Sequence, residues 1–152
     1  MLFKLKSIKF ESKSSLEKIE SCAFSQIYGQ SQIVLPSSVK MIDSFSFSQA
    51  ENVESIEFLG DSIEIPGYDC FSDCEKLKSI SFPNAKKIEF DWKVSMNGIP
   101  KKTKIRVRKD AELICEDIES FKDRIEYFTG KIEKRVQKDE KDDNSDDDND
   151  TN

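Results

Sequence analysis

A short pattern that returns at a nearly fixed interval constrains this chain more than any other feature. Its copies Val53–Phe58 and Leu77–Phe82 are 24 residues apart, and Leu5–Phe10 precedes the first of them by twice that step. A further copy, Gln30–Pro36, fills the gap with one residue inserted. A period in the twenties is typical of a solenoid in which each repeat adds one strand to a parallel sheet. The alternation of apolar and polar residues within each copy predicts a short strand with one face inward.

The second half of each repeat is equally regular. Leu16, Ile19 and Phe24 are followed, at a step of 23 residues, by Val39, Ile42 and Phe47; Ile63, Ile65 and Phe71 form a slightly shifted third copy. We expect a second short extended piece followed by a tight turn that contains the phenylalanine. Because a single repeat cannot bury its own apolar face, neighbouring repeats must stack. Phe24, Phe47 and Phe71 are therefore predicted to form an internal ladder.

The pattern changes toward the C-terminus. The fourth repeat continues into Phe90–Val94 without the phenylalanine turn, which predicts that the array ends there apart from one terminal strand, Thr103–Arg108. From Ile114 to Ile132 apolar residues recur at alternating spacings of four and three, the pattern of an amphipathic helix. We expect this helix to cap the last repeat. Pairing with another helix is the alternative, although the stripe is short for a coiled coil.

These patterns divide the chain into three parts. Residues 1–109 are expected to form a repeat solenoid of about four repeats plus the terminal strand. Residues 110–137 are expected to form the capping helix, and residues 138–152 a disordered acidic tail. The predicted fold class is α/β, rich in β-structure and built from short parallel strands.

The acidic tail carries most of the net charge. Residues 139–152 hold eight acidic residues against one lysine, in a chain with a formal charge of −6. Such a polyanion can attract basic proteins, for example histones or ribosomal proteins, or serve only to keep the chain in solution. Ser145, followed by three aspartates, is a possible phosphorylation site for an acidophilic kinase. Asp142, Asn144 and Asp146 imitate the start of a calcium loop, but the required glycine and final glutamate are absent.

Residues for catalysis or for a cofactor are hard to find. The chain has no histidine, no phosphate-binding glycine loop and no nucleophile motif, so we expect no enzyme, no cofactor and no metal site. The four cysteines lack paired CxxC spacing and are expected to be structural thiols. Lysine and arginine alternate with acids, which argues against nucleic acid as a partner.

Localisation rests on what the chain lacks. We expect no signal peptide and no membrane span, because no apolar run has the required length. The expected location is the cytoplasm, or the cell surface if the chain is part of a longer precursor.

The motifs together resemble a known family. Leu35–Ile42, Ser21–Phe24 and Phe71–Ile80 are similar to the units of BspA-like, or treponemal, leucine-rich repeats, and the resemblance covers about residues 3–94. Ser46 departs from it, since alanine usually precedes the turn phenylalanine there. The resemblance implies a non-enzymatic adhesion or protein-binding module, often found on the surface of bacteria and unicellular parasites.

The strand pattern also indicates where a partner would bind. The outward positions of the predicted strands, which would form one row across the sheet, are Lys9, Val34, Glu57, Ser81 and Arg106. We therefore expect a protein–protein interaction scaffold whose ligand the sequence does not identify. The alternatives are a binder of basic proteins through the acidic tail, and a fragment of a longer array. In the last case the uncovered strand Leu5–Phe10 would allow self-association or stacking.

Overall fold

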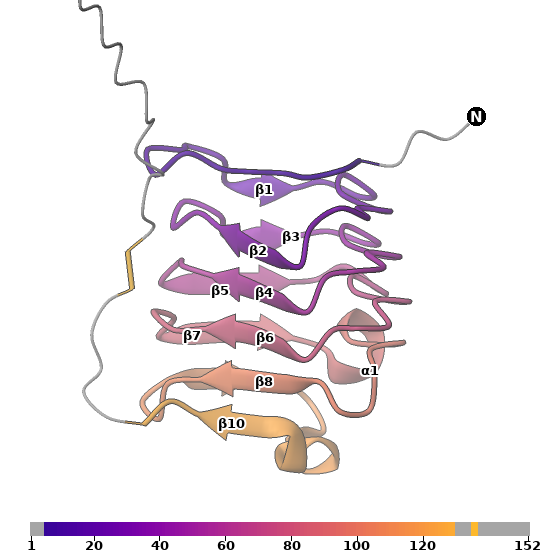
Figure 1. Cartoon of the computed structure of the whole chain (residues 1–152). Coiled ribbons are helices and arrows are strands. Elements are labelled where there is room, and N and C mark those ends of the chain that lie inside the picture. Colours follow the sequence, from indigo (N-terminus) through magenta and orange to yellow (C-terminus); the bar gives the residue numbers. More distant parts are fainter. Residues whose placement is uncertain (1–4, 130–134, 137–152) are drawn as a thin grey trace, which may run out of the picture.

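The computed structural model describes residues 5–129 and 135–136, and shows a stack of turns bounded by two parallel sheets (Figure 1). One sheet has the order β1-β3-β5-β7-β9 and the other the order β10-β8-β6-β4-β2. The strands of the first sheet are β1 (Lys18–Ile19), β3 (Met41–Ile42), β5 (Ser62–Ile65), β7 (Lys87–Phe90) and β9 (Glu112–Ile114). Those of the second are β2 (Gln32–Leu35), β4 (Ser55–Phe58), β6 (Ser79–Phe82), β8 (Lys104–Val107) and β10 (Ile125–Tyr127). The predicted solenoid of short parallel strands is confirmed.

Register between the turns places identical or similar residues above one another. In the second sheet Ile33 pairs with Ile56, Ile56 with Ile80, and Ile80 with Ile105, and each of these side chains is fully buried. Because strand side chains alternate between faces, this register sends the flanking polar residues outward together. The repeat period is therefore the number of residues that one full turn needs to return to the same register.

The turn phenylalanines form a continuous stack inside the solenoid. The Phe24 and Phe47 rings lie 5.7 Å apart, and those of Phe47 and Phe71 lie 6.0 Å apart at an interplanar angle of 6°. Phe58 and Phe82, on adjacent strands, form a second stack at 4.9 Å. The aromatic rings predicted as a ladder therefore do stack, turn upon turn.

The turns that hold these rings require unusual backbone. In each of the three turns, two non-glycine residues four positions apart have positive φ angles; they are Cys22 and Gln26, Phe45 and Gln49, and Asp69 and Asp73. This left-handed conformation costs on the order of 1 kcal/mol for each such residue. Backbone hydrogen bonds to the next turn hold it in place, as where Phe47 N–H donates to the Cys70 carbonyl over 2.9 Å.

Buried hydroxyl groups connect successive turns. Ser95 Oγ donates to the Ile65 carbonyl, and Thr103 Oγ1 donates to the Leu77 carbonyl, each over 2.6 Å. Both side chains are fully buried, so each hydroxyl needs a partner within the protein. These two hydroxyl groups therefore add hydrogen bonds between one turn and the next inside the core.

The array does not end after the fourth repeat and one terminal strand: the predicted strand Thr103–Arg108 is confirmed as β8, but β9 and β10 follow it. Where the phenylalanine turn is missing, the chain forms a short helix, α1 (Trp92–Ser95), capped by the Asp91 carboxylate, which accepts from the Lys93 and Val94 amides. Ser95 and Met96 then occupy the buried positions of the turn. With the core filled by these residues, β8, β9 and β10 extend both sheets beyond it.

The predicted capping helix at 110–137 is also wrong for the residues that the structure describes. Residues 110–129 contain β9, two single-turn 3-10 helices (Ile118–Ser120 and Lys122–Arg124) and β10. The exposed edges of β7 and β8 explain the difference: their unpaired backbone groups accept another strand, which outweighs local helical patterning. The segment nevertheless covers the core. Phe121 is buried and stacks on Trp92, with ring centroids 4.3 Å apart.

The N-terminal copy of the strand motif does not form a strand either. Residues 5–10 contain none, although the Tyr28 and Gly29 amides donate to the Leu5 and Lys6 carbonyls. Phe10 packs against Phe24 in an edge-on arrangement at 5.8 Å. This segment therefore follows the path of a solenoid turn without completing the sheet.

The central phenylalanine of the ladder should dominate the stability of the stack. We expect Phe47→Ala to lower the free energy of unfolding by about 3–5 kcal/mol, because it leaves a cavity between two rings. The matched variant Tyr28→Ala removes an aromatic ring that is 39% exposed and should cost less than about 1 kcal/mol. Urea unfolding followed by circular dichroism would measure both. Equal losses in the two variants would contradict the stacked core.

Candidate functional site

The outer face of the second sheet gathers the residues predicted to bind a partner. Register pairs Val34 with Glu57, Glu57 with Ser81, and Ser81 with Arg106, and the row continues to Glu126 on β10. A second outward row runs parallel to the first and contains Gln32, Ser55, Ser79 and Lys104. We call these two rows the strand face. Four of the five predicted residues thus lie in one register row, and sequence reasoning missed Glu126 because β10 was expected to be helical.

Lys9 lies outside this row. Its segment, residues 5–10, contains no strand, and the amide of the neighbouring Ile8 donates to the side-chain oxygen of Gln30 over 2.7 Å rather than to a strand. A glutamine side chain thus replaces the backbone partner that a continued sheet would supply. Lys9 is exposed, but the sheet register does not include it.

The strand face has small residues at its centre and charged residues around them. Ser55, Ser79 and Ser81 occupy the middle, whereas Arg106 pairs with Glu126 at 3.1 Å and its guanidinium lies 4.6 Å from the Phe128 ring centroid. Lys78 pairs with Glu54 at 3.2 Å beside the strands. Surface ion pairs of this kind contribute little to stability, so these charges are available for recognition.

One carboxylate on the strand face is not exposed. Glu57 has a side chain that is only 12% accessible, and it forms an ion pair with Arg135, whose side chain is 51% accessible. The Asn84 side chain, at the end of β6, holds the backbone of the same arginine through two hydrogen bonds of 2.7 Å. Sequence reasoning gave neither Asn84 nor Arg135 a binding role, since nothing in their local sequence signals this long-range contact.

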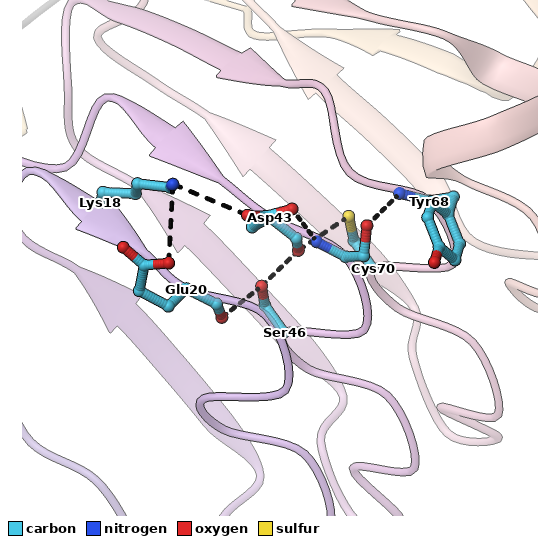
Figure 2. A network of polar contacts seen from close by, with 7 residues as sticks. Lys18, Glu20, Asp43, Ser46, Tyr68 and Cys70 are labelled. Atoms are coloured by element: carbon cyan, nitrogen blue, oxygen red, sulfur yellow. Dashed lines mark hydrogen bonds and ion pairs between the residues drawn. The ribbon is translucent and has the colours of Figure 1, made fainter.

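A second polar cluster lies between the turns of the other sheet (Figure 2). Lys18 lies 3.6 Å from Glu20 and 3.7 Å from Asp43, while an Asp43 carboxylate oxygen accepts the Ser44 amide at 2.7 Å. That backbone hydrogen bond is the main cause that lowers the pKa of the Asp43 carboxyl below its ordinary value.

The other contacts of this cluster connect neighbouring turns. Ser46 Oγ donates to the carbonyls of Glu20 and Asp43, and the Tyr68 amide donates to Ser44 Oγ over 3.1 Å (Figure 2). Two of these hydrogen bonds, from Ser46 Oγ to the Glu20 carbonyl and from the Tyr68 amide to Ser44 Oγ, therefore link a side chain to the backbone of an adjacent repeat. The cluster fixes the spacing of the phenylalanine turns, and its polar atoms are already engaged in that role.

Two of the four thiols lie deep in the core. Burial raises the pKa of Cys70 to about 12 and that of Cys74 to about 11, and their sulfur atoms lie near the Asp43 and Phe47 carbonyls. Cys22 is exposed and Cys115 is half-buried. The cysteines are free, in keeping with their interpretation as structural thiols.

Several sequence predictions fall outside the described residues. Ser145, the calcium-like residues 142–146 and the acidic tail all lie within 137–152. Among residues 5–129 and 135–136, no group of three or more potential metal ligands comes together. Over that same part of the chain, none of the helices has the length and apolar character that crossing a bilayer requires.

Comparison with known proteins supports the repeat architecture. The family model for the BspA type leucine rich repeat region matches residues 2–108 in six copies, which confirms the resemblance seen in the motifs. No curated protein matches the chain, and no solved structure does. β9 and β10 follow the matched region and extend the same two sheets.

Thiol reactivity should separate the exposed cysteine from the buried pair. At pH 8 we expect a thiol-reactive disulfide such as DTNB to modify about one equivalent rapidly, at Cys22, because only the thiolate reacts and it must be accessible. Cys115 should react more slowly, and Cys70 and Cys74 only after unfolding in urea. Cys22→Ser should remove the fast phase. Rapid reaction of all four thiols in the folded protein would contradict the buried positions.

Proposed function

This chain belongs to the BspA-type leucine-rich-repeat family, and we propose on that basis that it is a scaffold that binds a protein partner through the strand face. Such solenoids are generally non-enzymatic, and their stacked repeats offer extended surfaces for protein ligands. The observation that supports this face most strongly is the register that aligns Glu57, Ser81, Arg106 and Glu126 in one row.

The spacing and chemistry of the strand face suit an extended polar partner. Neighbouring strands lie about 4.8 Å apart, so each repeat offers one residue of the row at a regular interval. The central serines leave room for partner side chains, and acidic and basic residues alternate along the row. Charges of both signs favour a partner with a complementary pattern over a generally acidic or basic one.

An adhesin-like role at a cell surface is the finer part of this proposal. It rests on the family resemblance, because many proteins with such repeats are adhesion modules. The competing mechanism is attraction of basic proteins to the eight acidic residues of 139–152. The two mechanisms differ in their response to salt, since a polyanion loses its attraction as ionic strength rises.

Capture with matched variants would test the strand face. The intact protein, used as bait, should lose its specific partners when the face carries Ser81→Arg or Arg106→Ala. It should retain them with Glu64→Lys or Lys87→Ala, which change exposed positions on the other sheet. Circular dichroism of each variant would verify folding. The proposal fails if both face variants capture the same partners as the unchanged protein.

A further variant distinguishes binding through the strand face from attraction by the acidic tail. Replacing the acidic residues of 139–152 with asparagine and glutamine keeps the chain length while removing the charge. Face-driven binding should survive this change and persist at high salt. Loss of all partners in this variant, with the face variants unaffected, would assign binding to the tail.

A further inference from the structure

The contact between Asn84 and Arg135 has the geometry with which proteins hold an extended peptide. Asn84 Nδ2 donates to the Arg135 carbonyl, and the Arg135 amide donates to Asn84 Oδ1, each over 2.7 Å. The amide and carbonyl of one residue point to the same side only when the backbone is extended, as in a strand pair. The asparagine amide thus replaces one residue of a neighbouring strand, and it contacts groups that every amino acid carries.

Asn84 is held in position for this task. Its Nδ2 group also donates to the Leu59 carbonyl over 3.0 Å, and the residue is 3% exposed. Both of its amide protons and its oxygen are therefore in use while Arg135 is bound. Without an occupant, one donor and one acceptor of a recessed amide would lose their partners, which is unfavourable. The position consequently favours a bound peptide group.

Glu57 adds a preference for one side chain. Its carboxylate is recessed on the strand face and contacts Nε of Arg135, while most of the other outward positions nearby are serines. A carboxylate that is largely shielded from water interacts strongly with a guanidinium, whose planar donors match its geometry. Asn84 therefore binds the backbone of the peptide, and Glu57 binds the arginine side chain.

The chain's own segment is a weakly held occupant. Figure 1 shows residues 135–136 as the short yellow segment alongside the middle turns of the solenoid, well separated from β10. Val136 remains 69% exposed, so the segment buries little apolar surface where it docks. The attachment that the structure describes for residues 135–136 consists of two hydrogen bonds and one ion pair, which a competing peptide can reproduce.

We propose that Glu57 and Asn84 form a binding site for an extended peptide segment that carries an arginine, and that Arg135 occupies this site as an internal competitor. The proposal deepens the function proposed above and rests on it, since the site is part of the same face. The partner is then a protein with an exposed, extended, arginine-containing segment. Tethering gives Arg135 a high effective concentration, so it suppresses partners that bind more weakly.

Fluorescence anisotropy with a labelled peptide of residues 131–139 would test the site in the full-length protein. Arg135→Ala should bind this peptide at least about fivefold more tightly than the unchanged chain, because the internal segment loses its ion pair with Glu57 and competes only through its backbone contacts to Asn84. In the Arg135→Ala background, Glu57→Gln should weaken binding roughly tenfold. The matched change Glu64→Gln, on the other sheet, should leave binding within about twofold.

Changes in the peptide test the same contacts without altering the protein. A peptide with Arg135→Gln should bind roughly tenfold more weakly. Methylation of the Arg135 amide removes the donor to Asn84 and should abolish binding. Methylation of the Val136 amide is the control, because adjacent amides of an extended chain point in opposite directions.

Two outcomes would overturn the proposal. One is no peptide binding by the Arg135→Ala protein at millimolar concentration, and the other is binding that ignores Glu57→Gln and Arg135 methylation. Partner capture that still depends on Ser81 and Arg106 would then leave the strand-face function standing. The opposite result is peptide binding that depends on Glu57, with partner capture unaffected by changes at Ser81 and Arg106. It would support the peptide site and contradict partner binding by the whole strand face.

Discussion

Hydrogen bonding between turns of nearly equal length is the constraint on which this structure depends. Each of these turns, 23 to 25 residues long, must return to the register of the previous one, so that Ile33, Ile56, Ile80 and Ile105 lie above one another. The stacked rings of Phe24, Phe47 and Phe71 then fill the interior at the same spacing. Even the left-handed residues of the turns persist because the adjacent turn holds them. No repeat is stable alone, and the interfaces between repeats supply the core.

The ends of such a stack need a different solution, since each exposes a sheet edge and an open core. At the C-terminal end the chain keeps adding strands while changing what fills the interior. α1 replaces a phenylalanine turn, and Phe121 packs on Trp92 and Phe90. The Arg124 guanidinium lies over the Trp92 ring, 4.9 Å from its centroid, and donates to the Thr103 carbonyl over 3.2 Å. Aromatic and guanidinium groups thus close the core where regular repetition stops.

The regularity that stabilises the interior also organises the exterior. The register places one side chain per repeat at the same position on the strand face. The repeat alone is therefore enough to produce a continuous row of residues. Local departures from regularity make that surface uneven. Asn84 and the recessed Glu57 break the uniformity of the face, and both contact Arg135 from a distant part of the chain. The site that we propose for a partner therefore lies where residues differ from their equivalents in the other repeats.

The sequence by itself determined the solenoid, the two strands of each repeat and the burial of the stacked phenylalanines. A spacing that recurs in every repeat is a local signal, and each further copy strengthens it. It also placed Val34, Glu57, Ser81 and Arg106 in one row, since side chains alternate strictly along a strand. It misjudged residues 110–129, where apolar spacings of three and four suit a helix in isolation. Only the tertiary structure supplied the unpaired edges of β7 and β8, which turned that segment into strands. The same holds for Asn84, Glu57 and Arg135: a contact between residues far apart depends on where the folded backbone brings them, and no spacing in the chain encodes it.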